Sequence, residues 1–394
     1  MDETIEEAPV PLPGPAPRAA RGRPSAAVVV VAAAVVLGSA VIAWSLATRD
    51  SASSSGAGGP GATSPGEGER DQEGEGAGSV PGEDAGEPPR PLGTIAPAEG
   101  ADALCPAGTV CSSFTVECSR VSVPATVYMA TGRPSGTPRG VVLFFSGGEG
   151  DSYWGGGAPV AEEWLADLQD EGFETIRARW PEGWTDTAAG DEAGMASTAC
   201  RSATVVRWAY DNRFVPMGLE PAPGACGFCV TGNSAGSSQA AYTLAFYGLD
   251  TIVDAAILTG GPPHAAIAKG CLRRAEDEPF WYDSGNASGL DAAWGFARGE
   301  GPCARGDPAW VERWQADSVD LGGNDYVYPT TRVVFILGTK DQTVAPAHAR
   351  DLLARLDASG TPWVEERTVT GLRHVIERSP DGLSELRDAV LTVP

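Results

Sequence analysis

A serine in a glycine-rich turn is the first candidate for chemistry in this sequence. Residues 229–246, CVTGNSAGSSQAAYTLAF, open as a short β-branched run and close as an Ala-rich helical run, with Ser234 between Gly232 and Gly236. A serine hydroxyl is a poor nucleophile until an imidazole takes its proton, and the imidazole works best when a carboxylate fixes its tautomer. The alternative is that these small residues only ease a strand into a helix. The positions of histidines and carboxylates bear on this choice.

The chain has three histidines. His374 lies between the last expected strand and the last expected helix, where a loop can carry it over the strand ends, so we expect it to be the general base. His264 follows the end of a strand, and we expect it to be a substrate-pocket residue. His348 lies at the apolar-to-polar boundary of a helix, which is typical of a partly exposed surface residue.

Asp341 is the expected partner of the base. It lies three residues past Gly338, in a short loop after a buried strand. A carboxylate at such a strand end can reach a histidine in the next strand's loop. The chain order is therefore Ser234, Asp341, His374, which is nucleophile, acid, base.

This order, together with the strand, G-x-S-x-G and helix at residues 227–248, resembles the α/β-hydrolase superfamily over about residues 121–393. The resemblance implies that the backbone amide of Ala235 is one oxyanion donor. It implies that the other comes from Gly147 or Gly148, where lipases and esterases often have H-G-G-G; Ser146 departs from that pattern. It implies no metal and no organic cofactor.

Strand-like and helix-like segments alternate along the chain, which predicts an α/β fold with a mostly parallel, doubly wound sheet. Reactive residues in such sheets lie at the carboxyl ends of the strands. The expected strands are 113–124, 125–131, 140–145, 173–180, 227–232, 251–260, 331–339 and 362–370. The expected helices are 158–172, 196–212, 237–248, 346–360 and 379–391.

The irregular stretch 261–330 lies where α/β-hydrolases commonly insert a cap or lid. Its aromatic residues could stack on sugars or acyl chains, or could pack the core of a small cap. Trp154 is expected at the substrate pocket, and Trp180 and Trp184 could also border the cleft.

The sequence of the N-terminal part predicts a membrane anchor. Residues Ala26–Ala47 are 22 residues without a charge, long enough to cross a bilayer. Arginines 18, 21 and 23 precede this segment and Arg49 follows it, which places the N-terminus in the cytoplasm and the remainder outside. A cleaved signal peptide is the alternative. We expect residues 1–25 to be a disordered tail, 48–100 a flexible Gly/Ser/Pro/Glu linker and 101–394 the hydrolase domain.

The net charge and the cysteines indicate which partners are excluded and which compartment is expected. The formal net charge is −24 with only two lysines, which makes nucleic acid an unsuitable partner. All eight cysteines follow the predicted anchor, which suits disulfides in an oxidising space. We expect Cys271 to pair with Cys303 and Cys105 with Cys118. Cys226 and Cys229 could instead form half a zinc site or a redox motif.

These observations predict a membrane-anchored, outward-facing serine hydrolase that cleaves a carboxylic ester through an acyl-enzyme. The outward tether favours a small-molecule or envelope ester as the substrate. A serine peptidase or acyltransferase on the same fold is one alternative, because fold does not fix substrate. A catalytically inactive surface binding module is another. The sequence leaves the oligomeric state open.

Overall fold

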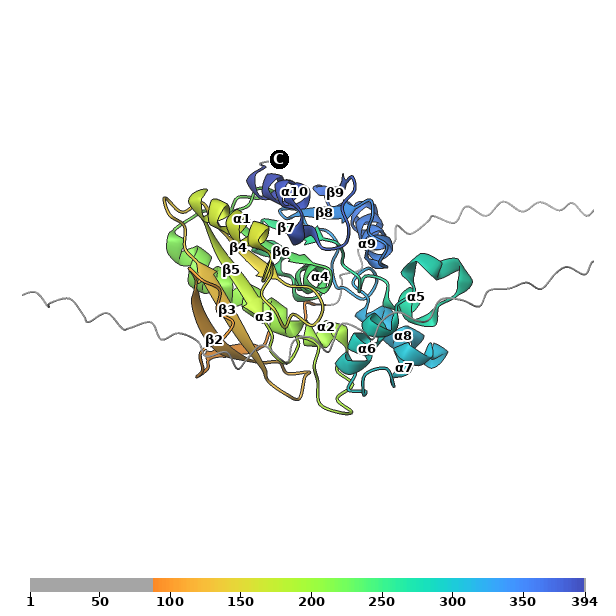
Figure 1. Cartoon of the computed structure of the whole chain (residues 1–394). Helices are drawn as coiled ribbons and strands as arrows, with labels where there is room; N and C mark the ends of the chain where they lie inside the picture. Colours follow the sequence, from red (N-terminus) through yellow and green to blue (C-terminus); the bar gives the residue numbers. More distant parts are fainter. Residues whose placement is uncertain (1–87, 393–394) are drawn as a thin grey trace, which may run out of the picture. The chain divides into compact units, whose positions relative to one another are not determined.

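The computed structural model describes residues 88–392 (Figure 1). The expected tail 1–25, the expected anchor 26–47 and most of the expected linker 48–100 lie outside the described residues. Among residues 88–392, no helix is both long enough and apolar enough to span a bilayer.

A nine-stranded sheet forms the centre of the described part, in the order β1-β2-β3-β5-β4-β6-β7-β8-β9. The first three strands pair antiparallel, β3 also runs antiparallel to β5, and the strands from β5 to β9 are parallel. The strands are β1 Thr94–Pro97, β2 Val110–Glu117, β3 Ala125–Gly132, β4 Gly140–Phe145, β5 Phe173–Arg179, β6 Phe228–Asn233, β7 Ala255–Thr259, β8 Arg332–Gly338 and β9 Val364–Val369. The prediction of a mostly parallel sheet is confirmed.

Strand β1 corrects one boundary. Its residues fall within the expected linker 48–100, yet Ile95 pairs with Val116 of β2 and Thr94 with Glu117. The short sequence TIAP carries little apolar periodicity, so its strand conformation depends on pairing with β2. The folded domain therefore begins before residue 101.

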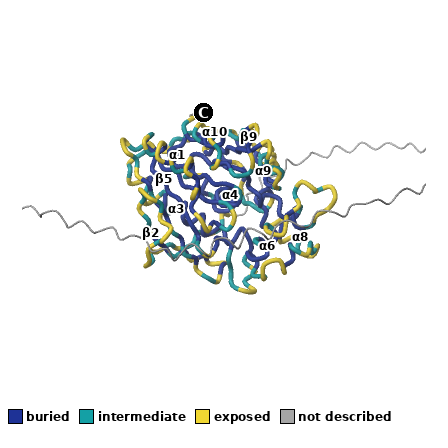
Figure 2. The backbone as a smooth tube through the Cα atoms, in the orientation of Figure 1, coloured by how far each residue is buried: buried dark blue, intermediate teal, exposed yellow. Residues whose placement is uncertain are grey.

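Helices cover both faces of the sheet. Helices α3 and α4 pack on one face, and α1 and α10 contribute to the apolar core of the other. The helices are α1 Pro159–Asp170, α2 Met195–Thr198, α3 Cys200–Ala209, α4 Ala235–Tyr247, α5 Ile267–Leu272, α6 Ser284–Ala293, α7 Pro302–Arg305, α8 Val311–Asp317, α9 Ala345–Ser359 and α10 Pro380–Leu391. Figure 2 shows the buried backbone running through the sheet and α4. This two-sided covering is the doubly wound arrangement.

The central parallel strands bring three loops together. Strand β4 is buried along its whole length, as expected for a strand covered on both faces. Asn233 at the end of β6 pairs with Thr259 at the end of β7, and Thr259 pairs with Ile336 of β8. Because these strands are parallel and in register, the segments that follow β6, β7 and β8 meet at one edge of the sheet.

The segment between β7 and β8 contains helices α5 to α8, which lie together beside the sheet in Figure 1. A disulfide between Cys271 and Cys303 joins α5 to α7. Most of its aromatic side chains are buried, including Tyr282, Trp294 and Trp314, whereas Trp281 is 36% exposed. The aromatic residues therefore serve mainly to pack this segment.

All eight cysteines form disulfides: Cys105–Cys111, Cys118–Cys200, Cys226–Cys229 and Cys271–Cys303. The expected Cys271–Cys303 pair is confirmed, and the expected Cys105–Cys118 pair is wrong. Cys105 and Cys111 flank a turn that brings their Cα atoms within 5.9 Å. Cys118, at the end of β2, instead faces Cys200 at the start of α3.

Candidate active site

Ser234 occupies the turn between β6 and α4. Its φ is 55° and its ψ is −122°, a backbone conformation that costs a non-glycine residue about 1–3 kcal/mol and is found mainly at functional sites. The turn is held by its neighbours. The Ser234 amide donates to Thr259 O at 2.9 Å, and Ser234 O accepts from the amide of Ser237 at 2.9 Å. Ser234 is thus presented by a fixed backbone at the carboxyl end of β6.

The two glycines of the motif allow this turn. A Cβ atom at Gly232 would lie 2.8 Å from Phe145 O, and one at Gly236 would lie 2.7 Å from Ser146 O. Both distances are shorter than real side chains tolerate. Close approach of β6, α4 and the end of β4 therefore requires glycine at both positions.

His374 and Asp341 meet at the same edge of the sheet. His374 Nδ1 lies 2.8 Å from Asp341 Oδ2, although the two residues come from the loops after β9 and β8. The Asp341 side chain is fully buried, and that of His374 is 23% exposed. This bond fixes Nδ1 and leaves Nε2 of the imidazole as the nitrogen available for proton transfer.

Thr343 completes the environment of Asp341. Asp341 Oδ1 accepts from the Thr343 amide at 2.9 Å and from its hydroxyl at 2.7 Å. Burial alone would raise the pKa of Asp341, but the hydrogen bonds from His374 and Thr343 outweigh burial and lower that pKa. Asp341 is therefore a carboxylate at neutral pH and can stabilise an imidazolium.

Ser234 and His374 line two adjoining clefts. The first, the loop cleft, has a volume of about 260 Å³ and is bounded by the 146–156 loop and by residues 374–378. The second, the cap cleft, has a volume of about 310 Å³ and is bounded by residues 342–345 and by Trp281, Asp283 and Asn286. The serine and the histidine thus lie where the two clefts meet, which leaves space on both sides of a bond held over Ser234.

The expected oxyanion loop lies against Ser234. A Cβ atom at Gly147 would be 3.4 Å from Ser234 Cβ, and Gly148 has a φ of 59°, which favours glycine. Ser146 Oγ donates to Ser152 O at 2.5 Å and so closes the loop. Gly147 and Gly148 both line the loop cleft together with Ser234. The two candidate glycine donors therefore lie in the same cleft as Ser234.

His264 lies beside this loop, in a cavity of about 130 Å³ that Gly148 and Ala235 also line. Its side chain packs near Trp184, with ring centroids 6.1 Å apart. Burial lowers the pKa of His264 to about 3, so the imidazole is neutral. His264 is separate from the Asp341–His374 pair.

Two expectations are wrong. Trp154 does not line the pocket: it is 1% exposed and packs against Phe144 and Trp164 beneath the loop, while its neighbour Tyr153 lines the loop cleft. His348 is not a surface residue: it is fully buried because the segment after β7 covers α9.

The sequence analysis missed several residues around the clefts. Tyr153 is anchored by donating to Asp102 Oδ2 at 2.6 Å, and Asp102 also pairs with Arg179. Glu377 lines the loop cleft three residues after His374. The short spacing from His374 was a usable signal for Glu377, whereas Asp102 comes close only through the fold. In the described chain, no three His, Cys, Asp or Glu side chains form a group that could hold a metal ion.

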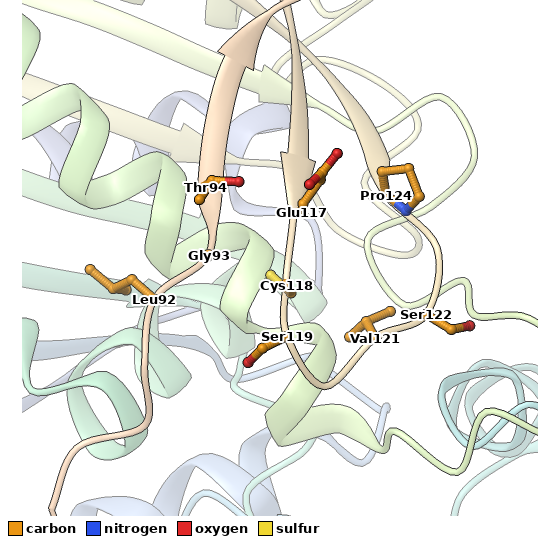
Figure 3. A pocket seen from close by; sticks show the side chains of 9 residues that line it. All are labelled: Leu92, Gly93, Thr94, Glu117, Cys118, Ser119, Val121, Ser122 and Pro124. Carbon is orange, nitrogen blue, oxygen red and sulfur yellow. The ribbon is translucent and has the colours of Figure 1, made fainter.

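A larger depression, of about 510 Å³, lies at the β1–β2 edge of the sheet (Figure 3). Its lining includes Gly93, Glu117, Ser119 and the disulfide-bonded Cys118. It contains no residue of the Ser234 site, and Cys118 is unavailable as a nucleophile. This depression is therefore separate from the two clefts around Ser234.

Comparison with known proteins finds no matching family model and no matching curated protein. Solved structures with a similar arrangement include a thermostable esterase from Pseudomonas putida, 15% identical with a TM-score of 0.45, covering 72% of this chain and 82% of that chain. A bacterial heroin esterase is 14% identical with a TM-score of 0.44, covering 72% and 83%. A puromycin-hydrolyzing peptidase from Mycobacterium tuberculosis is 14% identical with a TM-score of 0.42, covering 73% and only 40%.

The class of fold follows from the chain's own geometry. The sheet is mostly parallel and covered on both faces, Ser234 lies on a strained strand-to-helix turn, and Asp341 and His374 follow later strands. These features define an α/β-hydrolase fold.

Proposed function

We propose that this protein is a serine hydrolase that cleaves a carboxylic ester through an acyl-enzyme. The observation that carries the proposal is the bond between His374 Nδ1 and Asp341 in the same pair of clefts as Ser234. A serine on a strained turn beside an imidazole oriented by a carboxylate is the arrangement that activates a hydroxyl for attack on a carbonyl.

In the first half of the proposed reaction, Ser234 Oγ attacks the ester carbonyl carbon while His374 Nε2 takes the hydroxyl proton. The resulting imidazolium is stabilised by Asp341. The oxyanion accepts hydrogen bonds from the amide of Ala235 and from Gly147 or Gly148, donors of a kind that contribute about 3–4 kcal/mol each. His374 then gives its proton to the departing alkoxide, which leaves as an alcohol and yields the acyl-serine.

In the second half, water enters where the alcohol left. His374 takes a proton from the water, and the hydroxide attacks the acyl carbonyl to give a second oxyanion in the same position. Collapse of this intermediate returns the proton to Ser234 Oγ and releases the carboxylic acid.

Fluorophosphonate labelling tests this proposal. The full-length protein should react covalently at Ser234, should hydrolyse short p-nitrophenyl esters, and should lose both properties in Ser234→Ala at unchanged thermal stability. Ser384→Ala, an exposed serine of α10, is the matched control and should keep both. Labelling of Ser234→Ala at the wild-type rate would refute the assignment, and turnover of peptide amides but not esters would replace esterase by peptidase.

The proposal includes location. Ala26–Ala47 would anchor the chain in the membrane and residues 48–87 would tether the domain outside, where an envelope ester or a small-molecule ester is accessible. Protease added to intact protoplasts should remove a C-terminal epitope tag. A tag that is protected until the protoplasts are lysed would contradict the outward orientation.

A further inference from the structure

A carboxylate lies in the loop cleft beside the proposed nucleophile. Glu377 belongs to the short turn Ile376–Arg378 that follows His374, and it lines the same cleft as Ser234. Its position is set by the backbone: the Ile376 amide donates to Asn233 Oδ1 at 3.4 Å, which joins this turn to the residue before Ser234. Glu377 is therefore held at a defined place in the site and has no part in the proposed proton transfers.

The Glu377 carboxylate lacks a partner from another side chain of the described residues. Its Oε2 is shielded from water and has no hydrogen-bond donor. Leaving a buried carboxylate oxygen without a hydrogen-bond donor costs more free energy than leaving a buried neutral polar group unpaired. Burial raises the pKa of Glu377, and its own backbone amide and the nearby charge of Arg378 only partly oppose this effect. A donor brought by a ligand would remove the cost.

Three other polar side chains of the loop cleft already have partners, and the exposed Arg378 also lines this cleft. Ser146 donates to Ser152 O, the Tyr153 hydroxyl donates to Asp102, and Asn233 Oδ1 accepts from Thr259 and Ile376. The remainder of the lining is rich in glycine. Glu377 is thus the acidic side chain in this cleft that is free to accept from a bound molecule.

We propose that the loop cleft binds a cationic, amine-bearing part of the substrate and that Glu377 accepts its N–H donors. A charge-assisted hydrogen bond of this kind is about twice as strong as a neutral one. This inference rests on the proposed function and specifies its substrate class: an ester that carries an ammonium group a few atoms from the scissile carbonyl. Glu377 is then a specificity-determining residue.

Two pairs of isosteric esters test this assignment on the full-length protein. In the first pair the charge is in the acyl group: p-nitrophenyl β-alaninate against p-nitrophenyl butanoate. In the second pair it is in the alcohol: dimethylaminoethyl acetate against 3-methylbutyl acetate. For at least one pair, kcat/KM should favour the cationic ester by about tenfold or more after correction for uncatalysed hydrolysis, because a site built to bind a donor discriminates against the analogue that lacks it.

Glu377→Gln should bring that ratio of kcat/KM close to one. Glu312→Gln removes a negative charge from an exposed position on α8 and should keep the wild-type ratio. A ratio near one in the wild-type protein for both pairs would overturn the inference. So would a preference that survives in Glu377→Gln.

Fluorophosphonate labelling of Ser234 separates this result from the parent proposal. Labelled protein that hydrolyses cationic and neutral esters equally would overturn the role of Glu377 and leave the serine hydrolase intact. Protein that is neither labelled nor active on any of the four esters would overturn both.

Discussion

Arg298, in the segment between β7 and β8, forms an ion pair with Glu149, the residue that directly follows Gly148 in the proposed oxyanion loop. Arg298 Nη1 lies 2.8 Å from Glu149 Oε1, and Arg298 Nη2 lies 3.1 Å from Asp186 Oδ1. Glu149 Oε2 also accepts from the Thr185 hydroxyl at 2.6 Å. The inserted segment therefore holds the loop that is proposed to supply an oxyanion donor.

Arg298→Ala should lower kcat of the full-length protein by about 3- to 10-fold, because small displacements of catalytic groups are costly. Its effect on the free energy of unfolding should be below about 1 kcal/mol, since both partners are partly exposed and such ion pairs contribute little to stability. Ester hydrolysis and urea unfolding measure the two effects.

Arg313→Ala is the matched control for this ion pair. Arg313 lies in the same inserted segment as Arg298, and it pairs with the exposed Glu192 at 3.1 Å. This ion pair does not include a residue of the proposed oxyanion loop. Arg313→Ala should keep the wild-type kcat. Equal losses of kcat in both variants would indicate a general disturbance of the segment and would contradict a specific role for the Arg298–Glu149 pair.

The second prediction concerns the Asp341–His374 pair. His374→Ala should lower kcat by nearly as much as Ser234→Ala, by several orders of magnitude, since residues that act as a unit show non-additive losses. Asp341→Asn should cost about 10⁴-fold, because an amide stabilises the wrong tautomer of the imidazole. Pre-steady-state and steady-state hydrolysis of a p-nitrophenyl ester measure these changes.

His264→Ala is the informative contrast for that series. His264 lines the small cavity beside Ala235 and is neutral, so its loss should raise KM more than it lowers kcat. If His264→Ala is inactive while His374→Ala remains active, the general base is His264, which follows β7, and the assignment of His374 is wrong.

The third prediction concerns Gly236. Gly236→Ala should reduce the free energy of unfolding by about 1–3 kcal/mol and lower kcat, because its Cβ would collide with the carbonyl oxygens at the end of β4. Gly136→Ala is the control: a Cβ there meets no atom within 4 Å, so its thermal unfolding should match that of the wild type. A Gly236→Ala protein with wild-type stability and kcat would show that the strand and helix can separate without cost.

Local patterns in the sequence predicted most of the central sheet. The run GVVLFF, residues 140–145, is apolar throughout because β4 is covered on both faces. The turn at Ser234 was equally visible, since a G-x-S-x-G between a β-branched run and an Ala-rich run marks a tight strand-to-helix connection. The separate loop positions of Asp341 and His374 also followed from the alternating pattern, and the structure places them in hydrogen-bond contact.

Contacts between distant segments were not visible in local patterns. Strand β1 has only four residues and exists through its register with β2. Trp154 is expected at the substrate pocket, but the fold turns it toward Phe144. The expected helix 196–212 is divided at Ala199 and ends in a π-helical turn, Tyr210–Phe214. Strand β1 and the orientation of Trp154 depend on packing partners outside their own segments.

The burial of His348 also depends on contacts with another segment, and it affects the pH dependence of the protein's stability. The periodicity of its own helix suggested partial exposure, but its Nδ1 accepts from the Ala266 amide at 3.0 Å and its Nε2 bonds Phe280 O at 3.1 Å. The ring also stacks on Tyr282 at 5.1 Å. Both nitrogens are therefore satisfied only in the neutral form, with the proton on Nε2.

Acid should destabilise the protein through this residue. Burial lowers the pKa of His348 from 6.5 to about 3, so the unfolded chain takes up a proton there first as the pH falls. The stabilising contribution of the neutral ring is complete above the unfolded pKa and is lost as the pH falls from 6.5 toward 3. Between about pH 7.5 and pH 5, this loss amounts to about 2 kcal/mol.

Comparison with His348→Gln isolates that contribution, because buried carboxyls such as Asp317, whose pKa burial raises to about 7, titrate equally in both proteins and act in the opposite direction. At about pH 7.5 the wild type should be the more stable protein, since glutamine replaces the two hydrogen bonds imperfectly and loses the stacking on Tyr282. At about pH 5 the difference between the two free energies of unfolding, measured in urea, should be smaller by about 2 kcal/mol. A difference that stays constant between the two pH values would mean that His348 titrates normally and that the burial of its neutral ring is wrongly assigned.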